Sequence, residues 1–116
     1  MNLLNCLPCA TKDGKEKLYD LTDAVALTMI DSKHQIVEIL TSSSEKLILR
    51  IKAPFETFSS WLSVLGFTEA TSGVLVNLNQ KLDYDMNHKI LYFDKILISS
   101  VSRSNEKKFK TIMGKT

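Results

Sequence analysis

Residues 46–66 constrain the fold more than any other stretch, because strand chemistry changes to helix chemistry within them. In KLILRIK, apolar and charged residues alternate, a pattern typical of a β-strand with one buried face. Pro54 then stands where the first turn of a helix tolerates proline. Before Gly66, a suitable helix stop, apolar residues recur at spacings of three and four: Phe55, Phe58, Trp61, Leu62 and Leu65. The stretch predicts a strand followed by an amphipathic helix over about residues 54–65.

Short strand patterns separated by polar turns precede this unit. Residues 17–21, 25–30 and 35–41 contain alternating or β-branched apolar residues, and polar residues typical of turns lie between them. Parallel strands need long crossover connections, so closely spaced strands with tight turns predict an antiparallel meander. The expected fold class is therefore α+β, mainly β, with a bent antiparallel sheet that the helix caps.

The second half of the chain predicts a β-hairpin over about residues 73–98. Apolar and polar residues alternate from Val74 to Leu82, residues 83–88 have the composition of a turn, and residues 90–98 are strongly apolar. Two hypotheses follow from this pattern. Either the hairpin pairs with the meander and completes its sheet, or the chain is a half-domain that a second polypeptide completes.

Length and composition fit one small domain. The 116 residues carry a net charge of +2, which is too small to indicate a nucleic-acid partner. The sequence has no run of about 18 apolar residues and no signal-peptide pattern at its start, so we expect a cytoplasmic protein without a transmembrane segment. The expected parts are a flexible N-terminus, a meander with its helix, a hairpin and a basic tail: residues 1–15, 16–66, 73–98 and 103–116.

Cys6 and Cys9 are the only cysteines, and several roles compete for them. A zinc site needs two more ligands, and the two histidines, His34 and His88, lack the spacing of small zinc modules. A redox pair needs a thioredoxin-like strand and helix, which the sequence around Pro8 does not offer. Both cysteines are weak candidates for lipidation by reversible palmitoylation. The simplest interpretation is two unmodified thiols in a poorly ordered terminus.

The segment LYDLTDAVALTMIDSKHQIVEILTSSSEKLILRIKAPFETFSSWLSVL resembles the C-terminal half of a pleckstrin-homology (PH) domain. In that family the last strands are followed by an amphipathic helix with a tryptophan on its inner face, and the helix closes one end of a bent antiparallel sandwich. Here residues 18–21 and 35–41 resemble two of those strands, residues 43–46 stand at the final hairpin turn, and Trp61 stands at the helix tryptophan. The resemblance covers about residues 18–65 and is partial and divergent.

The resemblance implies a non-enzymatic module for phosphoinositide-type membrane lipid, although the family's lipid-binding loop is missing. PH domains carry a basic loop ahead of this half. In this chain only about 15 residues precede Leu18, and their lysines are Lys12 and Lys15. No lipid-binding residue can therefore be transferred from the family by position.

Candidate lipid-binding residues come instead from two basic groups. The first lies on the polar face of the predicted strand and comprises Lys46, Arg50 and Lys52. The second lies in the tail, where residues 103–116 carry a net charge of +4 and predict a short basic amphipathic helix with Lys107, Lys108 and Lys110. Basic side chains of this kind attract an anionic membrane surface.

Metal-binding and catalytic patterns are weak. Asp83, Asp85, Asn87 and Asp94 have the spacing of a helix-loop-helix calcium loop, but His88 stands where that loop needs glycine and the flanks have strand patterns. The sequence also lacks a Gly-x-Ser-x-Gly elbow and a glycine-rich phosphate loop. We therefore expect no metal, no cofactor and no enzymatic activity.

Two functions from different classes remain. One is a peripheral membrane module that binds anionic phospholipid, which the basic tail and the N-terminal cysteines favour. The other is a protein-binding or adaptor module that uses an open sheet edge or is completed by a partner polypeptide, which the small net charge and the missing basic loop favour. The resemblance to PH domains makes lipid binding the first expectation, by analogy of fold.

Overall fold

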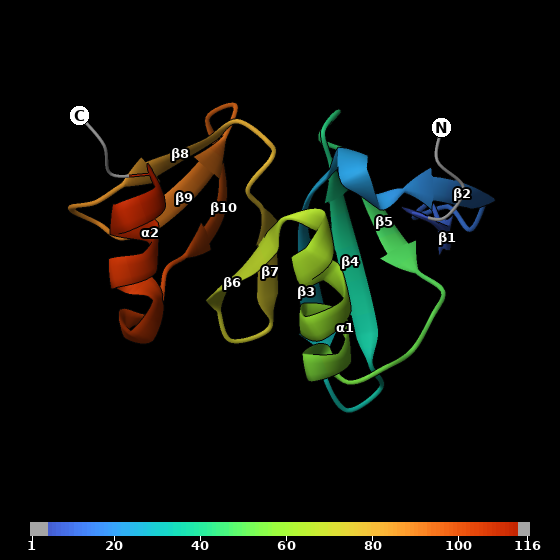
Figure 1. Ribbon diagram of the computed structural model, residues 1–116. Helices are drawn as coiled ribbons and strands as arrows, with labels where there is room; N and C mark the ends of the chain where they lie inside the picture. Colours follow the sequence, from blue (N-terminus) through green and yellow to red (C-terminus); the bar gives the residue numbers. More distant parts are fainter. Residues whose placement is uncertain (1–4, 114–116) are drawn as a thin grey trace.

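A computed structural model describes residues 5–113, and its larger sheet contains seven antiparallel strands (Figure 1). Their order across the sheet is β2-β1-β5-β4-β3-β7-β6. In that order they span Glu16–Asp20, Cys6–Ala10, Lys46–Leu49, Ile36–Thr41, Ala24–Asp31, Val74–Asn77 and Phe67–Thr71. The expected α+β, mainly β fold is confirmed, and β3, β4 and β5 form a meander. The first of the predicted strands, β2, lies outside it because it pairs with β1 and not with β3.

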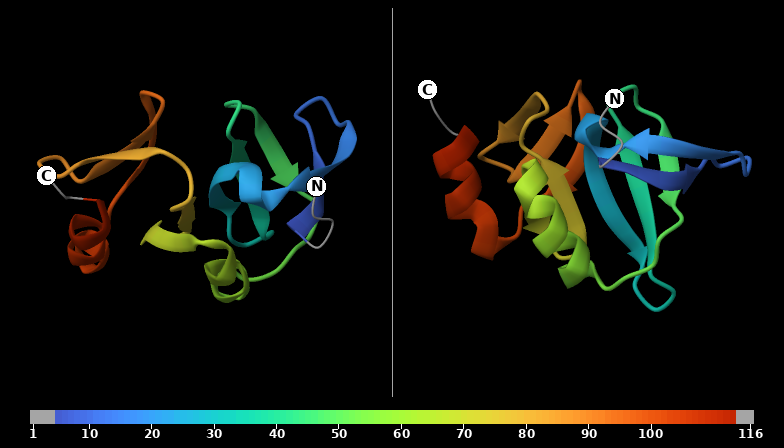
Figure 2. Two further views of the ribbon diagram at one scale, coloured as in Figure 1. Left: turned by 45° about the horizontal axis from the view of Figure 1, so that its top comes forward. Right: turned by 45° about the vertical axis from the view of Figure 1, so that its right-hand side comes forward.

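The predicted helix is confirmed as α1, Phe55–Leu62, which a 3-10 turn extends over Ser63–Leu65. It follows Pro54 and ends at Gly66, whose φ of 96° is a left-handed conformation that favours glycine. The helix lies against one face of the larger sheet (Figures 1 and 2). It closes a first core whose buried members include Leu27, Ile39, Leu47, Phe58 and Leu62.

Trp61 lies at the margin of this core. Its side chain is 39% exposed, whereas Phe58 and Leu62 on the same helix are buried. The Trp61 ring lies 6.5 Å from the Phe58 ring, measured between centroids. PH domains place the helix tryptophan on the inner face, so the chain departs from the PH pattern at this position.

The stretch expected to form one hairpin, residues 73–98, is divided between two sheets. Only β7 joins the larger sheet, and the rest forms a second antiparallel sheet of β8, β9 and β10 at Leu82–Asp85, Ile90–Phe93 and Ile96–Ser100. The first strand of the expected hairpin, β7, ends at Asn77. The Asn77 side chain accepts a hydrogen bond from the N–H of Asn79, which turns the chain. The second apolar run is itself split, since Asp94 and Lys95 adopt positive φ in the tight turn between β9 and β10.

The smaller sheet and the C-terminal helix α2, Glu106–Met113, build a second core (Figure 1). Its buried members include Val25, Ala70, Val76, Leu91 and Phe109. Because β3 and β7 contribute to both cores, all four residues of β7 are buried. The second half of the chain therefore covers the meander from within the same polypeptide.

The prediction of a flexible N-terminus over residues 1–15 is wrong for Cys6–Ala10, which form β1. This strand pairs with β2 on one side and with β5 on the other. Leu7 and Cys9 alternate into the first core, so the segment buries apolar surface as an ordinary strand does. Residues 1–4 of the predicted terminus lie outside the described residues.

Neither helix within residues 5–113 is long and apolar enough to cross a membrane. Both α1 and α2 span eight residues. A transmembrane helix needs roughly 20.

Candidate functional site

The two predicted basic groups lie at opposite ends of the molecule. Lys46 lies in β5, and Arg50 and Lys52 follow that strand. β5 lies near the N-terminus, whereas α2 lies at the other end beside the smaller sheet (Figures 1 and 2). The two groups therefore do not form one continuous basic surface.

The cations of the β5 group already have partners on the protein. Lys46 lies 4.0 Å from a carboxylate oxygen of Glu38, and Arg50 lies 3.2 Å from one of Glu16. Lys52 donates a hydrogen bond to the backbone carbonyl of His34, at 3.0 Å. With Glu38 and Glu16 beside its three cations, the β5 group has a net charge of only +1, which weakens the case for this group as a lipid site.

Lys108, a candidate from the tail, holds α2 against the larger sheet. Its Nζ donates hydrogen bonds to Thr68 Oγ1 at 2.7 Å and to the Glu69 carbonyl at 3.0 Å. Partial burial lowers the pKa of Lys108, and the nearby Glu69 carboxylate opposes that shift. We therefore assign Lys108 to the packing of α2 on β6.

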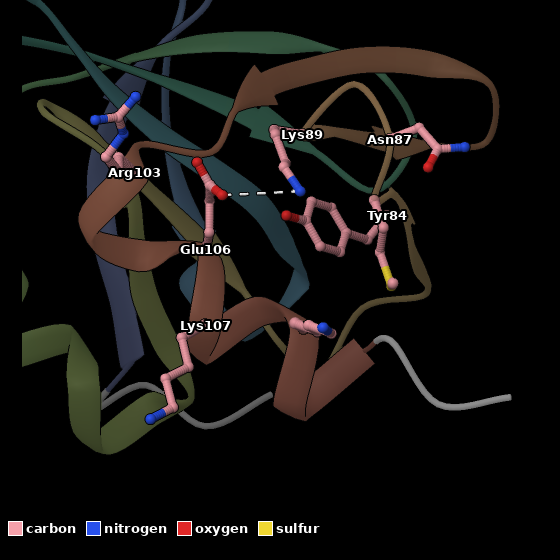
Figure 3. A pocket seen from close by; sticks show the side chains of 8 residues that line it. Tyr84, Asn87, Lys89, Arg103, Glu106 and Lys107 are labelled. Atoms are coloured by element: carbon pink, nitrogen blue, oxygen red, sulfur yellow. Dashed lines mark ion pairs between the residues drawn. The ribbon is translucent and has the colours of Figure 1, made fainter.

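The other two tail candidates, Lys107 and Lys110, line a pocket between α2 and the turn that joins β8 to β9 (Figure 3). Its volume is about 500 Å³. Four basic side chains and a single acidic one line it, for a net charge of +3: Lys89, Arg103, Lys107, Lys110 and Glu106. The chain thus brings cations from the β8–β9 turn and from residues 103–110 to one concave surface.

Lys89 and Glu106 face each other across the pocket. Lys89 Nζ lies 3.7 Å from Glu106 Oε1, and the Tyr84 ring lies beside this pair (Figure 3). Burial, together with the negative charges of Glu106 and Asp85, raises the pKa of Tyr84, so its hydroxyl stays protonated and can donate a hydrogen bond. Arg103 and Lys107 lie at the rim and point away from the Tyr84 ring (Figure 3). Outward rim cations suit a broad anionic surface better than a small enclosed ligand.

Asp85 fixes the turn that supplies Lys89. Its carboxylate accepts hydrogen bonds from the backbone N–H of His88 at 3.1 Å and of Asn87 at 3.0 Å, and it contacts His88 Nδ1 at 2.7 Å. These contacts, with the bond to the His88 ring the largest, lower the pKa of Asp85. The Asp85 carboxylate therefore stabilises the turn. Residues 5–113 contain no cluster of three or more acidic, His or Cys side chains suited to a metal ion.

Sequence patterns did not single out Tyr84, Lys89 and Arg103. Arg103 belongs to the basic tail, so the sequence shows its charge. The sequence does not indicate that Arg103 and Lys107 line the same pocket. Lys89 follows a turn-forming Asp-x-x-His segment and adopts a φ of 58°. No local periodicity indicates that this turn folds back onto a helix that begins 17 residues later.

The weak lipidation candidates differ in accessibility, because Cys9 is fully buried and Cys6 is half-buried. Burial raises the pKa of the Cys9 thiol to about 11, with Lys17 opposing the shift. We expect a maleimide to modify Cys9 about 100-fold more slowly in the native chain than in urea, because a buried thiol is both shielded and protonated. A Cys6→Ser variant isolates Cys9, and Cys9→Ser is its control. Equal rates in native buffer and in urea would show that β1 opens readily.

Comparisons with known proteins assign no family to the chain. No protein-family model and no curated protein matches its sequence. A proposal for its function therefore depends on the geometry of the chain itself.

Proposed function

We propose that the chain is a non-enzymatic, PH-like binding module that associates peripherally with membranes containing anionic, phosphoinositide-type lipid. The observation that carries the proposal is the pocket between α2 and the β8–β9 turn, with its net charge of +3. Of the original candidates, the proposal retains Lys107 and Lys110 and adds Lys89 and Arg103. Lys108 and the β5 group are assigned to contacts within the fold and not to lipid binding.

The charges set the expected strength of this association. A basic residue near an anionic membrane contributes about 1 kcal/mol, so a net charge of +3 gives about 3 kcal/mol, or roughly a 150-fold increase in partitioning. The attraction falls off within a Debye length, so added salt should weaken it steeply. The resulting affinity is modest and reversible.

Vesicle sedimentation tests the proposal. The full chain should sediment with phosphatidylcholine vesicles that contain phosphatidylinositol bisphosphate and stay in solution with phosphatidylcholine alone. The double variant Lys107→Glu, Lys110→Glu should bind at least about tenfold more weakly, since it removes two attractive charges and adds two repulsive ones. The matched control, Lys46→Glu with Lys52→Glu, makes the same change in net charge at the opposite end.

The two variants separate local from overall electrostatics. Weakened binding in the α2 variant alone would support the pocket as the lipid site. Equal losses in both variants would contradict it, because net charge alone would then govern binding. Absence of binding to either vesicle at low salt would contradict the proposal as a whole.

A further inference from the structure

The two edges of the larger sheet differ in how they are covered. At β6, the Ala70 carbonyl accepts a hydrogen bond from the Ser102 N–H at 2.9 Å, and the Glu69 carbonyl accepts one from Lys108. Within residues 5–113, β2 pairs with β1 and with no other strand. Figure 1 places β2 at the outer end of the sheet, opposite α2. Among the residues that the structure describes, no strand therefore lies on the outer side of β2.

Proline in β1 defines which β2 groups face outward. The Pro8 carbonyl accepts a hydrogen bond from the Arg50 N–H at 2.9 Å, so this carbonyl points toward β5. Successive residues of a strand point their polar groups to opposite sides. Leu7 and Cys9 therefore face β2, opposite Tyr19 and Lys17.

Glu16 and Leu18 then direct their N–H and C=O groups away from β1. None of the backbone hydrogen bonds of turns and loops within residues 5–113 uses these four groups. They form two donor–acceptor pairs at the spacing that an antiparallel strand requires.

The side chains on this edge have a definite pattern. Leu18 is 59% exposed and lies between Glu16 and Asp20 on one face of β2. The Glu16 side chain is 60% exposed despite its contact with Arg50. Hydrogen bonds from Thr22 lower the pKa of Asp20, which keeps its carboxylate ionised. The edge thus presents an acidic–apolar–acidic series.

Charge repulsion disfavours a second copy of the chain as the occupant. An antiparallel pair centred on Leu18 would place each Glu16 opposite Asp20 of the second copy, and a shift centred on Lys17 would place two lysines opposite each other. A shift in the other direction leaves few strand residues, because a 3-10 turn begins at Leu21. A polypeptide with complementary charge fits better than a copy of the same strand.

We propose that the β2 edge binds an extended segment of another protein as an antiparallel strand with a basic–apolar–basic series on one face. Its two basic side chains lie opposite Asp20 and Glu16, and its apolar side chain covers Leu18. The backbone groups of Glu16 and Leu18 supply the hydrogen bonds, and the side chains supply the selectivity. This site is separate from the basic pocket and does not depend on lipid binding.

A synthetic peptide, acetyl-Thr-Arg-Tyr-Val-Thr-Arg-Thr-amide, tests the proposal on the full chain by two-dimensional amide NMR. We expect chemical-shift changes concentrated in residues 15–20 and slowed hydrogen exchange at the Glu16 and Leu18 amides. Replacing both arginines of the peptide by glutamate should weaken binding about tenfold, because two attractive cross-strand pairs become repulsive. Shifts centred elsewhere, or no shifts at all, would overturn the proposal.

Two substitutions at one position separate strand addition from simple contact. Leu18→Pro removes an outward N–H without removing a hydrogen bond to β1, so the edge strand should tolerate it. Leu18→Thr removes the same apolar side chain and keeps the N–H. We expect the peptide to bind Leu18→Pro about tenfold more weakly than Leu18→Thr, with both variants giving dispersed spectra. Equal binding would overturn strand addition, and peptide-independent dimerisation through β2 would assign the edge to a second copy.

Discussion

Replacing Phe109 by alanine is expected to lower the free energy of unfolding by about 3–5 kcal/mol. Phe109 is fully buried in the second core, and its ring lies 6.0 Å from the Tyr84 ring, measured between centroids. Truncation leaves a cavity between α2 and the sheets and removes this aromatic contact. Urea unfolding of the full chain, followed by tryptophan fluorescence and circular dichroism, measures the change.

Ile112→Ala is the matched control for this prediction. Ile112 lies on the same helix but is 44% exposed, so its truncation should change stability by about 0.5 kcal/mol or less. A large difference between the variants would show that α2 is an integral part of the fold through its buried face. Similar small effects would contradict the second core and would mean that the basic residues of α2 are not held at the pocket.

The second large effect is expected at Asn77, a fully buried amide at the end of β7. Its Nδ2 donates hydrogen bonds to the Ala24 carbonyl at 2.9 Å and to the Thr22 carbonyl at 3.2 Å. Asn77→Ala removes both donors and leaves the Ala24 carbonyl without this partner, which costs about 1–3 kcal/mol for each orphaned group. Gln80→Ala is the control, because Gln80 also donates to Thr22 but lies near the surface, and we expect it to cost less than about 1 kcal/mol.

A carboxyl group at this position adds a pH dependence. In Asn77→Asp, burial and the two facing carbonyls should outweigh the hydrogen bond from the Asn79 N–H and raise the pKa of the introduced carboxyl in the folded state above its unfolded value. Stability should therefore be highest below the unfolded pKa of about 3.9 and should fall as pH rises through the folded pKa. Urea unfolding at a series of pH values measures this slope relative to Asn77→Ala. A variant that gains stability as pH rises would contradict the buried environment assigned to Asn77.

Part of the fold could be predicted because its signals are local. Alternating residues along β5, Pro54 before α1 and Gly66 after it are readable within one window of the sequence, and the structure confirms the strand and helix there. The N-terminal strand was missed because residues close to the start of the chain were interpreted as a poorly ordered terminus. Pro8 is tolerated there because it lies just beyond the β1–β5 pairs, which begin at Cys9, and its missing N–H removes no bond to β2.

The proposed sites required information that no local pattern holds. The sequence shows Lys107, Lys108 and Lys110 as basic residues of one helix. Lys108 contacts β6 while Lys107 and Lys110 line the pocket, and this difference depends on which side of α2 meets β6. The open edge at β2 depends likewise on the sheet order, which sets β2 at one end and places α2 over the other.

The mainly β class and the strand–helix unit of residues 46–66 follow from the amino-acid pattern, because alternation, periodicity and turn chemistry act between residues close in the chain. The pairing of Ala26 with Val76 and the contact of Lys89 with Glu106 follow only from the folded arrangement. Such contacts join residues far apart in sequence, and burial of two apolar cores selects among the many pairings that the same strands could make.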